Sequence, residues 1–208
     1  NGKLLNTITS GNWVAGNICA VDTLARTIYL YGYGKEKNIN PHYYTVYKAH
    51  IDREGVTPVA VEDGQHNADF LKSRKYFIDT YSKVNQEPVI TLKDNTGKTL
   101  LKLAKPDLSN VKAKGWVAPE PFSVMAADDR TELYGVMYKP ANFDPKKKYP
   151  IVSVVYPGPY YGFVPTAFAL SENHCSAMAQ LGMIVIKVGH RGDTPMRGKV
   201  YHAHGYNN

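Results

Sequence analysis

The feature that most constrains the fold is a series of short β-rich segments at even spacing in the first half of the sequence. They are rich in Val, Ile, Thr and Tyr, which suit a pleated, half-buried surface. Turn sequences such as Asp63-Gly64 separate them, and a glycine there supplies the positive φ that tight hairpins need. Eight strands are predicted, at residues 13–22, 27–34, 43–52, 57–62, 67–73, 76–84, 88–94 and 99–107.

The spacing of the predicted strands favours a few classes of all-β fold but does not decide between them. Eight strands between residues 13 and 107 give roughly one strand every twelve residues, which is typical of sandwiches, barrels and propellers. The eight strands also divide into two four-stranded blades, each roughly 40–50 residues long, the period of a propeller. The two halves share little sequence, so the pattern alone leaves propeller and sandwich equally supported.

The second part of the sequence has a different pattern, which begins near residues 112–116. A hairpin is predicted from residues 122–126 and 133–139. The apolar run at 151–156 lacks alternation, which indicates a strand buried on both faces, as in a parallel sheet.

A helix is predicted at residues 170–181, with Ser171 as its N-cap, Gly182 as its stop, and Cys175, Met178 and Leu181 on one face. A second buried strand follows at 183–188. Strand, helix and strand in this order predict a right-handed parallel crossover, the start of an α/β domain.

Composition and charge exclude several classes of protein. Hydrophobic residues make up 43% of the 208, enough for a core, so a disordered chain is excluded. No apolar run reaches the ~18 residues of a membrane-spanning helix. The formal charge of +7 is spread along the chain, and its only tight run is Lys146-Lys147-Lys148, which argues against nucleic acid as a partner. The cysteines, Cys19 and Cys175, fit no zinc spacing, and a disulfide between them is left open.

No complete catalytic or cofactor motif is present. The sequence has no G-x-S-x-G, no phosphate-binding loop, no dinucleotide fingerprint and no H-E-x-x-H. His202 and His204 would share one face of a strand and could ligate a metal, but no carboxylate or cysteine lies at useful spacing. We therefore expect no metal site and no cofactor.

Tyr156 is the strongest candidate for a functional residue. It ends the predicted strand at 151–156, and ligands of open α/β sheets bind at the carboxyl ends of strands. Its hydroxyl could donate a hydrogen bond to a developing oxyanion. The alternative is a packed ring with its hydroxyl in water. Arg191 and Arg197, in the glycine-rich loop after the next strand, are interpreted as structural, with an anion or domain-interface contact as the alternative.

Several short motifs, in order, carry a resemblance to a known family. They include Gly64-x-His66, Tyr76-Phe77-x-Asp79-x-Tyr81-Ser82, Pro119-Glu-Pro-Phe122, Thr131-Glu-Leu-Tyr-Gly135 and Val155-Tyr156-x-Gly158-Pro159. Over residues 9–200 the chain resembles the prolyl oligopeptidase family of serine peptidases, and most closely its dipeptidyl peptidase IV branch.

The resemblance implies a fold class: β-propeller blades (all-β) followed by a partial α/β-hydrolase domain. Residues 1–115 would be the last two blades, and residues 116–208 the N-terminal part of the catalytic domain, truncated before the nucleophile. Tyr156 matches the family's oxyanion-hole tyrosine. The Ser-Asp-His triad would fall after Asn208 and the glutamates that hold a substrate's amino group before Asn1, so substrate-binding residues are unknown here.

The resemblance also implies an activity for the parent protein. It would release N-terminal dipeptides from a peptide substrate, preferentially after proline, by acyl transfer without a cofactor. The 208-residue chain alone would be inactive, and we expect it to be unstable because open sheet edges remain. A homodimer of the parent is left open.

Two departures from the family pattern favour an alternative, a non-catalytic binding or assembly module with a decayed hydrolase tail. The family has Gly or Ala where Pro157 stands, and proline removes a backbone donor. The family's D-x-R-G reads Gly189-His190-Arg191-Gly192, so we expect a looser loop without an Asp–Arg pair.

Overall fold

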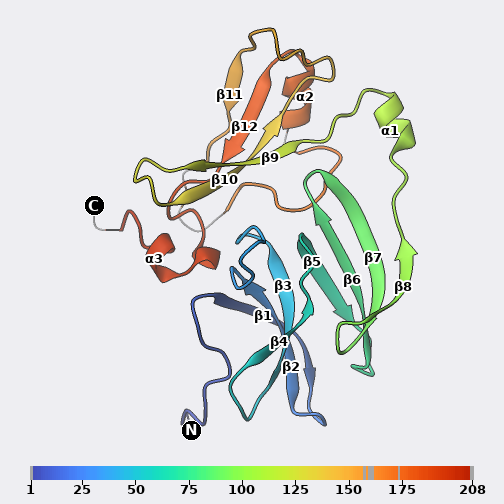
Figure 1. Cartoon of the computed structure of the whole chain (residues 1–208), viewed down its shortest axis with the longest axis vertical. Coiled ribbons are helices and arrows are strands. Elements are labelled where there is room, and N and C mark those ends of the chain that lie inside the picture. The colour runs from blue at the N-terminus through green and yellow to red at the C-terminus, as the bar shows by residue number, and fades with distance from the viewer. Residues whose placement is uncertain (1, 157, 159–161, 173, 207–208) are drawn as a thin grey trace. The chain divides into compact units, whose positions relative to one another are not determined.

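The computed structural model describes residues 2–156, 158, 162–172 and 174–206 (Figure 1). The chain forms two compact units, which are described separately. The first unit holds residues up to 82, with 88–105 and 196–198, and the second holds 83–87, 106–195 and 199 onward.

The first unit contains two four-stranded sheets in which sequence order and sheet order agree. One sheet has the order β1 (Val14–Asp22), β2 (Thr27–Tyr33), β3 (Tyr44–His50) and β4 (Val56–Ala60). The other has the order β5 (Gln65–Phe70), β6 (Tyr76–Lys83), β7 (Gln86–Asp94) and β8 (Thr99–Ala104). All eight predicted strands are present with small shifts at their ends, and each sheet is a propeller blade.

Side chains from both blades form one core in the first unit. Its buried members are Ala20, Tyr29, Val46, Val59, Ala60, Ala68 and Phe77. The Phe70 ring lies between those of Tyr29 and Phe77, with ring centroids 4.2 and 4.7 Å away. Val46 faces this core, whereas Tyr47 belongs to a second cluster with Leu30 and Ala49, because neighbouring side chains of a strand point to opposite faces.

One glycine allows the two blades to approach closely. Gly97 lies in the turn between β7 and β8 with φ of 93°, a left-handed conformation that side chains disfavour. A β-carbon there would also lie 2.5 Å from the carbonyl oxygen of Val59 in β4. Both the backbone conformation and the space therefore require glycine.

The second unit contains a mixed sheet. Its order is β11 (Ile151–Ser153), β12 (Ile184–Val188), β10 (Glu132–Tyr138) and β9 (Glu120–Met125). β9 and β10 form the predicted antiparallel hairpin, and β11 lies parallel to β12, as a strand–helix–strand crossover requires. The described part of the second unit also contains the short helices α1 (Ser109–Ala113), α2 (Cys175–Gln180) and α3 (Lys199–His202). A 3-10 turn at Pro195–Arg197 precedes α3 in the sequence.

The predicted helix at 170–181 is wrong in its extent. Helix α2 covers only Cys175–Gln180, and His174 rather than Ser171 is its N-cap, with φ of 66° and no capping side chain. Leu181 follows the helix and is 76% exposed, so it does not share the buried face of Cys175. Gly182, with φ of 91°, ends the turn as predicted.

The predicted strand at 151–156 is also shorter and more exposed than expected. β11 ends at Ser153, and the side chains of Ile151 and Val155 are 65% and 71% exposed. The reason is its place at the edge of the described sheet, where β12 is its only ladder partner. Burial on both faces is therefore wrong for this segment.

The core of the second unit lies between α2 and the sheet. Val136 and Tyr138 of β10 and Val185 of β12 pack with Cys175 and Ala179 of α2. No disulfide joins Cys175 to Cys19, and burial raises the pKa of both thiols, that of Cys19 to about 11. Within the described ranges, no helix has the length and apolar character to cross a membrane.

Candidate functional site

Tyr156 lies beyond the carboxyl end of β11. The chain follows β12 for one residue past the strand, since Val154 N–H donates to the carbonyl of Ile186 at 2.9 Å. Tyr156 is then 55% exposed, so its phenol can reach a bound group. Gly158 lies against its ring, and a β-carbon at 158 would be 2.8 Å from Cε1. Pro157 lies outside the described residues.

The loop that begins at Gly189 follows the carboxyl end of β12, the parallel neighbour of β11. Gly189 N–H donates to the carbonyl of Tyr134 at 2.9 Å, which anchors the start of the loop to β10. Arg191 Nη1 lies 2.9 Å from Oδ2 of Asp128 in the β9–β10 turn. The expected loss of an Asp–Arg pair is therefore wrong: an aspartate from another turn supplies the partner.

The partner of Arg191 is a well-ionised carboxylate. Hydrogen bonds from the side chain and backbone of Thr131, and more weakly the charge of Arg191, hold the pKa of Asp128 well below its usual range. Arg191 thus has the structural role that the sequence suggested. Arg197 belongs to the first unit, where its charge adds to burial in lowering the pKa of His42 to about 4.

A buried ion pair fixes the segment that leads to α2. Lys187 of β12 is 2% exposed, and its Nζ lies 3.0 Å from Oε1 of Glu172. The ammonium also lies 5.7 Å from the centre of the Phe163 ring, within cation–π range. Through these two contacts, Phe163 and Glu172 both bind Lys187 of the central strand β12.

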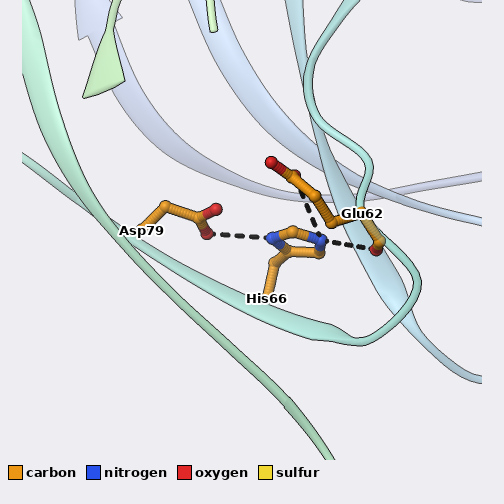
Figure 2. A group of neighbouring side chains, drawn as sticks. All are labelled: Glu62, His66 and Asp79. Carbon is orange, nitrogen blue, oxygen red and sulfur yellow. Dashed lines mark hydrogen bonds and ion pairs between the residues drawn. The ribbon is translucent and has the colours of Figure 1, made fainter. Parts of the chain in front are cut away.

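A group of ionisable side chains, which includes Glu62, His66 and Asp79, lies close together in the first unit (Figure 2). His66 and Asp79 are completely buried, and Lys93 beside them is 1% exposed. Asp79 Oδ1 lies 2.9 Å from His66 Nδ1, and its Oδ2 lies 3.1 Å from Lys93 Nζ. His66 Nε2 lies 2.8 Å from the backbone carbonyl of Glu62, whose carboxylate pairs with Lys93.

The chemistry of this group favours a structural role. Glu62, His66 and Asp79 have the donor types and spacing of a metal site. However, the ammonium of Lys93 lies within ion-pair distance of both carboxylates and so supplies the positive charge itself. The ring of His66 also stacks on Tyr81 at 5.2 Å. The cluster links three neighbouring strands, through His66 of β5, Asp79 of β6 and Lys93 of β7.

His202 and His204 are not arranged as two residues of one strand would be. His202 is the last residue of α3 and His204 follows in a turn, so the two do not share the face of a strand. The sequence did single out His66 and Asp79 as parts of a motif, but not Lys93 or Glu62. Lys93 could have been found from the alternation of β7, in which it occupies a buried position two residues after Thr91.

Comparisons with known proteins match this architecture. Residues 1–88 match the family model of the dipeptidyl peptidase IV (DPP IV) N-terminal region. Human dipeptidyl peptidase 8 is 29% identical over 197 residues, which cover 89% of this chain and 22% of that protein. The chain is related to the dipeptidyl peptidase IV family. Probable dipeptidyl-aminopeptidase B of Botryotinia fuckeliana is also 29% identical, over 94% of this chain and 22% of its own.

Solved structures give the same result for the dipeptidyl peptidase fold. The crystal structure of a putative dipeptidyl aminopeptidase IV from Bacteroides ovatus superposes with a TM-score of 0.74 at 25% identity, over 93% of this chain and 27% of that one. Porphyromonas gingivalis dipeptidyl peptidase 4 gives 0.72 at 26%, over 96% and 27%. The chain thus spans about a fifth of the length of its curated relatives and about a quarter of these structures.

Proposed function

We propose that this chain is part of a dipeptidyl peptidase that acts as a serine peptidase. In this proposal, residues 1–115 are the last two blades of the propeller and residues 116–208 begin the α/β-hydrolase domain. The whole protein binds a peptide by its free amino terminus and releases a dipeptide, preferentially after proline.

One observation carries the proposal: an exposed tyrosine follows the parallel strand at which the second unit's crossover begins. Tyr156 follows β11, the parallel neighbour of β12, on the side where α/β proteins bind ligands. Acyl transfer places a negative charge on the carbonyl oxygen of the tetrahedral intermediate. The phenol of Tyr156 donates a hydrogen bond to that oxygen and lowers the barrier.

The remaining machinery belongs to parts of the protein outside these residues. A triad serine attacks the carbonyl carbon, and the triad histidine takes the serine proton and passes it to the leaving amine. The present sequence has no G-x-S-x-G, so we propose that residues 1–208 alone release no dipeptide. A hydrogen-bond donor without a nucleophile has no intermediate to stabilise.

Replacing Tyr156 tests the proposal in the longest natural polypeptide that contains this chain. Tyr156→Phe keeps the ring and removes the donor, so we expect kcat on a Gly-Pro anilide to fall by roughly 10²–10³ with little change in KM. Tyr76→Phe is the matched control, since Tyr76 is 40% exposed in the first unit. A kcat within twofold of wild type for Tyr156→Phe would rule out the role.

The non-catalytic alternative makes the opposite prediction for covalent labelling. A serine-directed phosphonate labels the parent polypeptide if a triad serine is active. A folded parent that is not labelled and releases no dipeptide would favour a binding or assembly module.

A further inference from the structure

Gly189, the first residue after β12, has no room for a side chain. A β-carbon there would lie 2.6 Å from Oδ2 of Asp193 and 3.5 Å from the carbonyl oxygen of Tyr134. Contacts under 3.0 Å are essentially never made by real β-carbons. The φ of Gly189 lies outside the left-handed range, so the backbone conformation does not require glycine. Space, and specifically the Asp193 carboxylate, excludes a side chain at position 189.

The Asp193 carboxylate is held in place by its own surroundings. Asp193 is 1% exposed. The hydroxyl of Tyr201, a residue of α3, lies 3.0 Å from Oδ1 of Asp193 and 2.8 Å from the carbonyl oxygen of His190, and can donate to either. Asp193 N–H also donates to that carbonyl at 3.1 Å. The carboxylate is therefore an internal part of the loop and lies where a side chain at 189 would begin.

We propose that Gly189 and Asp193 form a matched pair, in which Asp193 supplies from four residues further on the carboxylate that an aspartate at 189 would supply. Asp193 is then a positioning residue for the loop at the carboxyl end of the sheet. Gly189 is a compensated change and no sign of a decayed site.

The same loop lies beside the segment that follows Tyr156. Thr194 is 5% exposed, and a β-carbon on Gly162 would lie 3.6 Å from its Cβ, which is ordinary contact. A shift of Asp193 would therefore move Thr194 against residue 162, on the chain that leads away from β11. The effect on catalysis rests on the proposed function, whereas the pairing of residues 189 and 193 does not.

Exchanging the two residues tests the pairing in the longest natural polypeptide that contains them. Gly189→Asp places a second side chain in the carboxylate's space, and Asp193→Gly leaves the Tyr201 hydroxyl without that acceptor. We expect each change to lower the Tm by about 5 °C or more. The double variant Gly189→Asp/Asp193→Gly moves the carboxylate back to 189 and should recover at least half of the combined loss. Asp193→Asn keeps the shape and one acceptor oxygen and should lose least.

A second pair of positions provides the control. Gly189→Asp combined with Asp69→Gly, an exposed position on β5, should show additive losses because the two residues belong to different units. Additive losses in the Gly189→Asp/Asp193→Gly variant as well would overturn the pairing.

Steady-state kinetics well below the Tm of every variant test the positioning role. We expect Asp193→Gly to lower kcat roughly 10- to 100-fold with KM within twofold, and the double variant to regain most of it. An unchanged kcat in a folded Asp193→Gly protein would overturn that role. Failure of the proposed function would give a different result from failure of the pairing or of the positioning role. The wild-type polypeptide would then release no dipeptide, while the double variant would still recover part of the loss in Tm.

Discussion

Each unit of the molecule buries a lysine in a strand, and the two lysines are neutralised in different ways. Lys93 of β7 lies among three groups of its own blade: the buried Asp79 and His66 and the partly exposed Glu62. Lys187 of β12 pairs with Glu172, whose side chain is 24% exposed, and lies over an aromatic ring. The first lysine pairs with a carboxylate that is completely buried, Asp79, as well as with Glu62, whereas the carboxylate partner of the second is partly exposed.

The difference shows what a buried charge requires. Burying an ammonium costs several kcal/mol, and partners repay that cost only when their geometry is good and their own charges are satisfied. In the blade, consecutive strands bring Asp79 and Lys93 together by local pairing. In the second unit, the partner of Lys187 comes from the segment before α2. We therefore expect the blade cluster to contribute more to stability, and three changes can break or sharpen this comparison.

The largest effect is expected from Lys93→Met, which removes the cation between two carboxylates. Asp79 is completely buried, so water could not replace the ammonium that now lies 3.1 Å from its carboxylate. We expect the free energy of unfolding to fall by about 3–5 kcal/mol in urea titrations followed by far-UV circular dichroism. Lys102→Met, at an exposed position of β8, is the control and should change stability by less than about 0.5 kcal/mol. A loss below about 1 kcal/mol for Lys93→Met would mean that the cluster is not a cooperative unit.

A smaller loss of stability is expected at acidic pH, because the folded first unit keeps His42 neutral. Burial, and then the charge of Arg197, lowers the pKa of His42 from 6.5 to about 4. A lowered pKa in the folded state means that the unfolded chain binds the proton more readily, so this contribution is complete above pH 6.5 and is lost as pH falls toward 4. We expect a loss of about 2 kcal/mol between pH 7 and 4.5.

His42→Gln isolates this step from the titration of the carboxylates. Its unfolding free energy should decrease less than that of wild type over the same pH range. Parallel curves for the two proteins would show that His42 takes up its proton equally in the folded and unfolded states.

The smallest effect is expected from Lys187→Met. Methionine retains the apolar stem of the side chain, and water can solvate the Glu172 carboxylate that loses its partner. We expect a loss of about 1–2 kcal/mol, measured by the same urea titrations. A loss as large as that of Lys93→Met would overturn the distinction between a lysine paired with a completely buried carboxylate and one paired with a partly exposed carboxylate.

The strands of the first unit could be predicted because each pairs with its neighbour in the sequence. The alternation in Tyr76–Lys83 and the Asp63-Gly64 turn report contacts a few residues away, so local patterns contain the needed information. The hairpin of β9 and β10 was found for the same reason.

The second unit was predicted less well because its contacts are not local. The apolar run at 151–156 indicates a buried strand, yet its burial depends on what lies beside β11, which the run itself does not specify. The helix before β12 begins at Cys175 instead of 170 although Ser171 has the chemistry of an N-cap. The position of the Asp193 carboxylate beside Gly189 was likewise hidden, since only the fold brings that carboxylate there.

The central proposal is that this chain belongs to a peptidase that binds the free amino terminus of its substrate. The most direct measurement compares release of the dipeptide from Gly-Pro anilide and from its N-acetylated form by the longest natural polypeptide that contains the chain. We expect release from the free amine and a rate at least about 100-fold lower from the acetylated form, because losing a charged contact costs about 3 kcal/mol. A folded polypeptide that cleaves neither substrate, or both equally, would contradict the proposal.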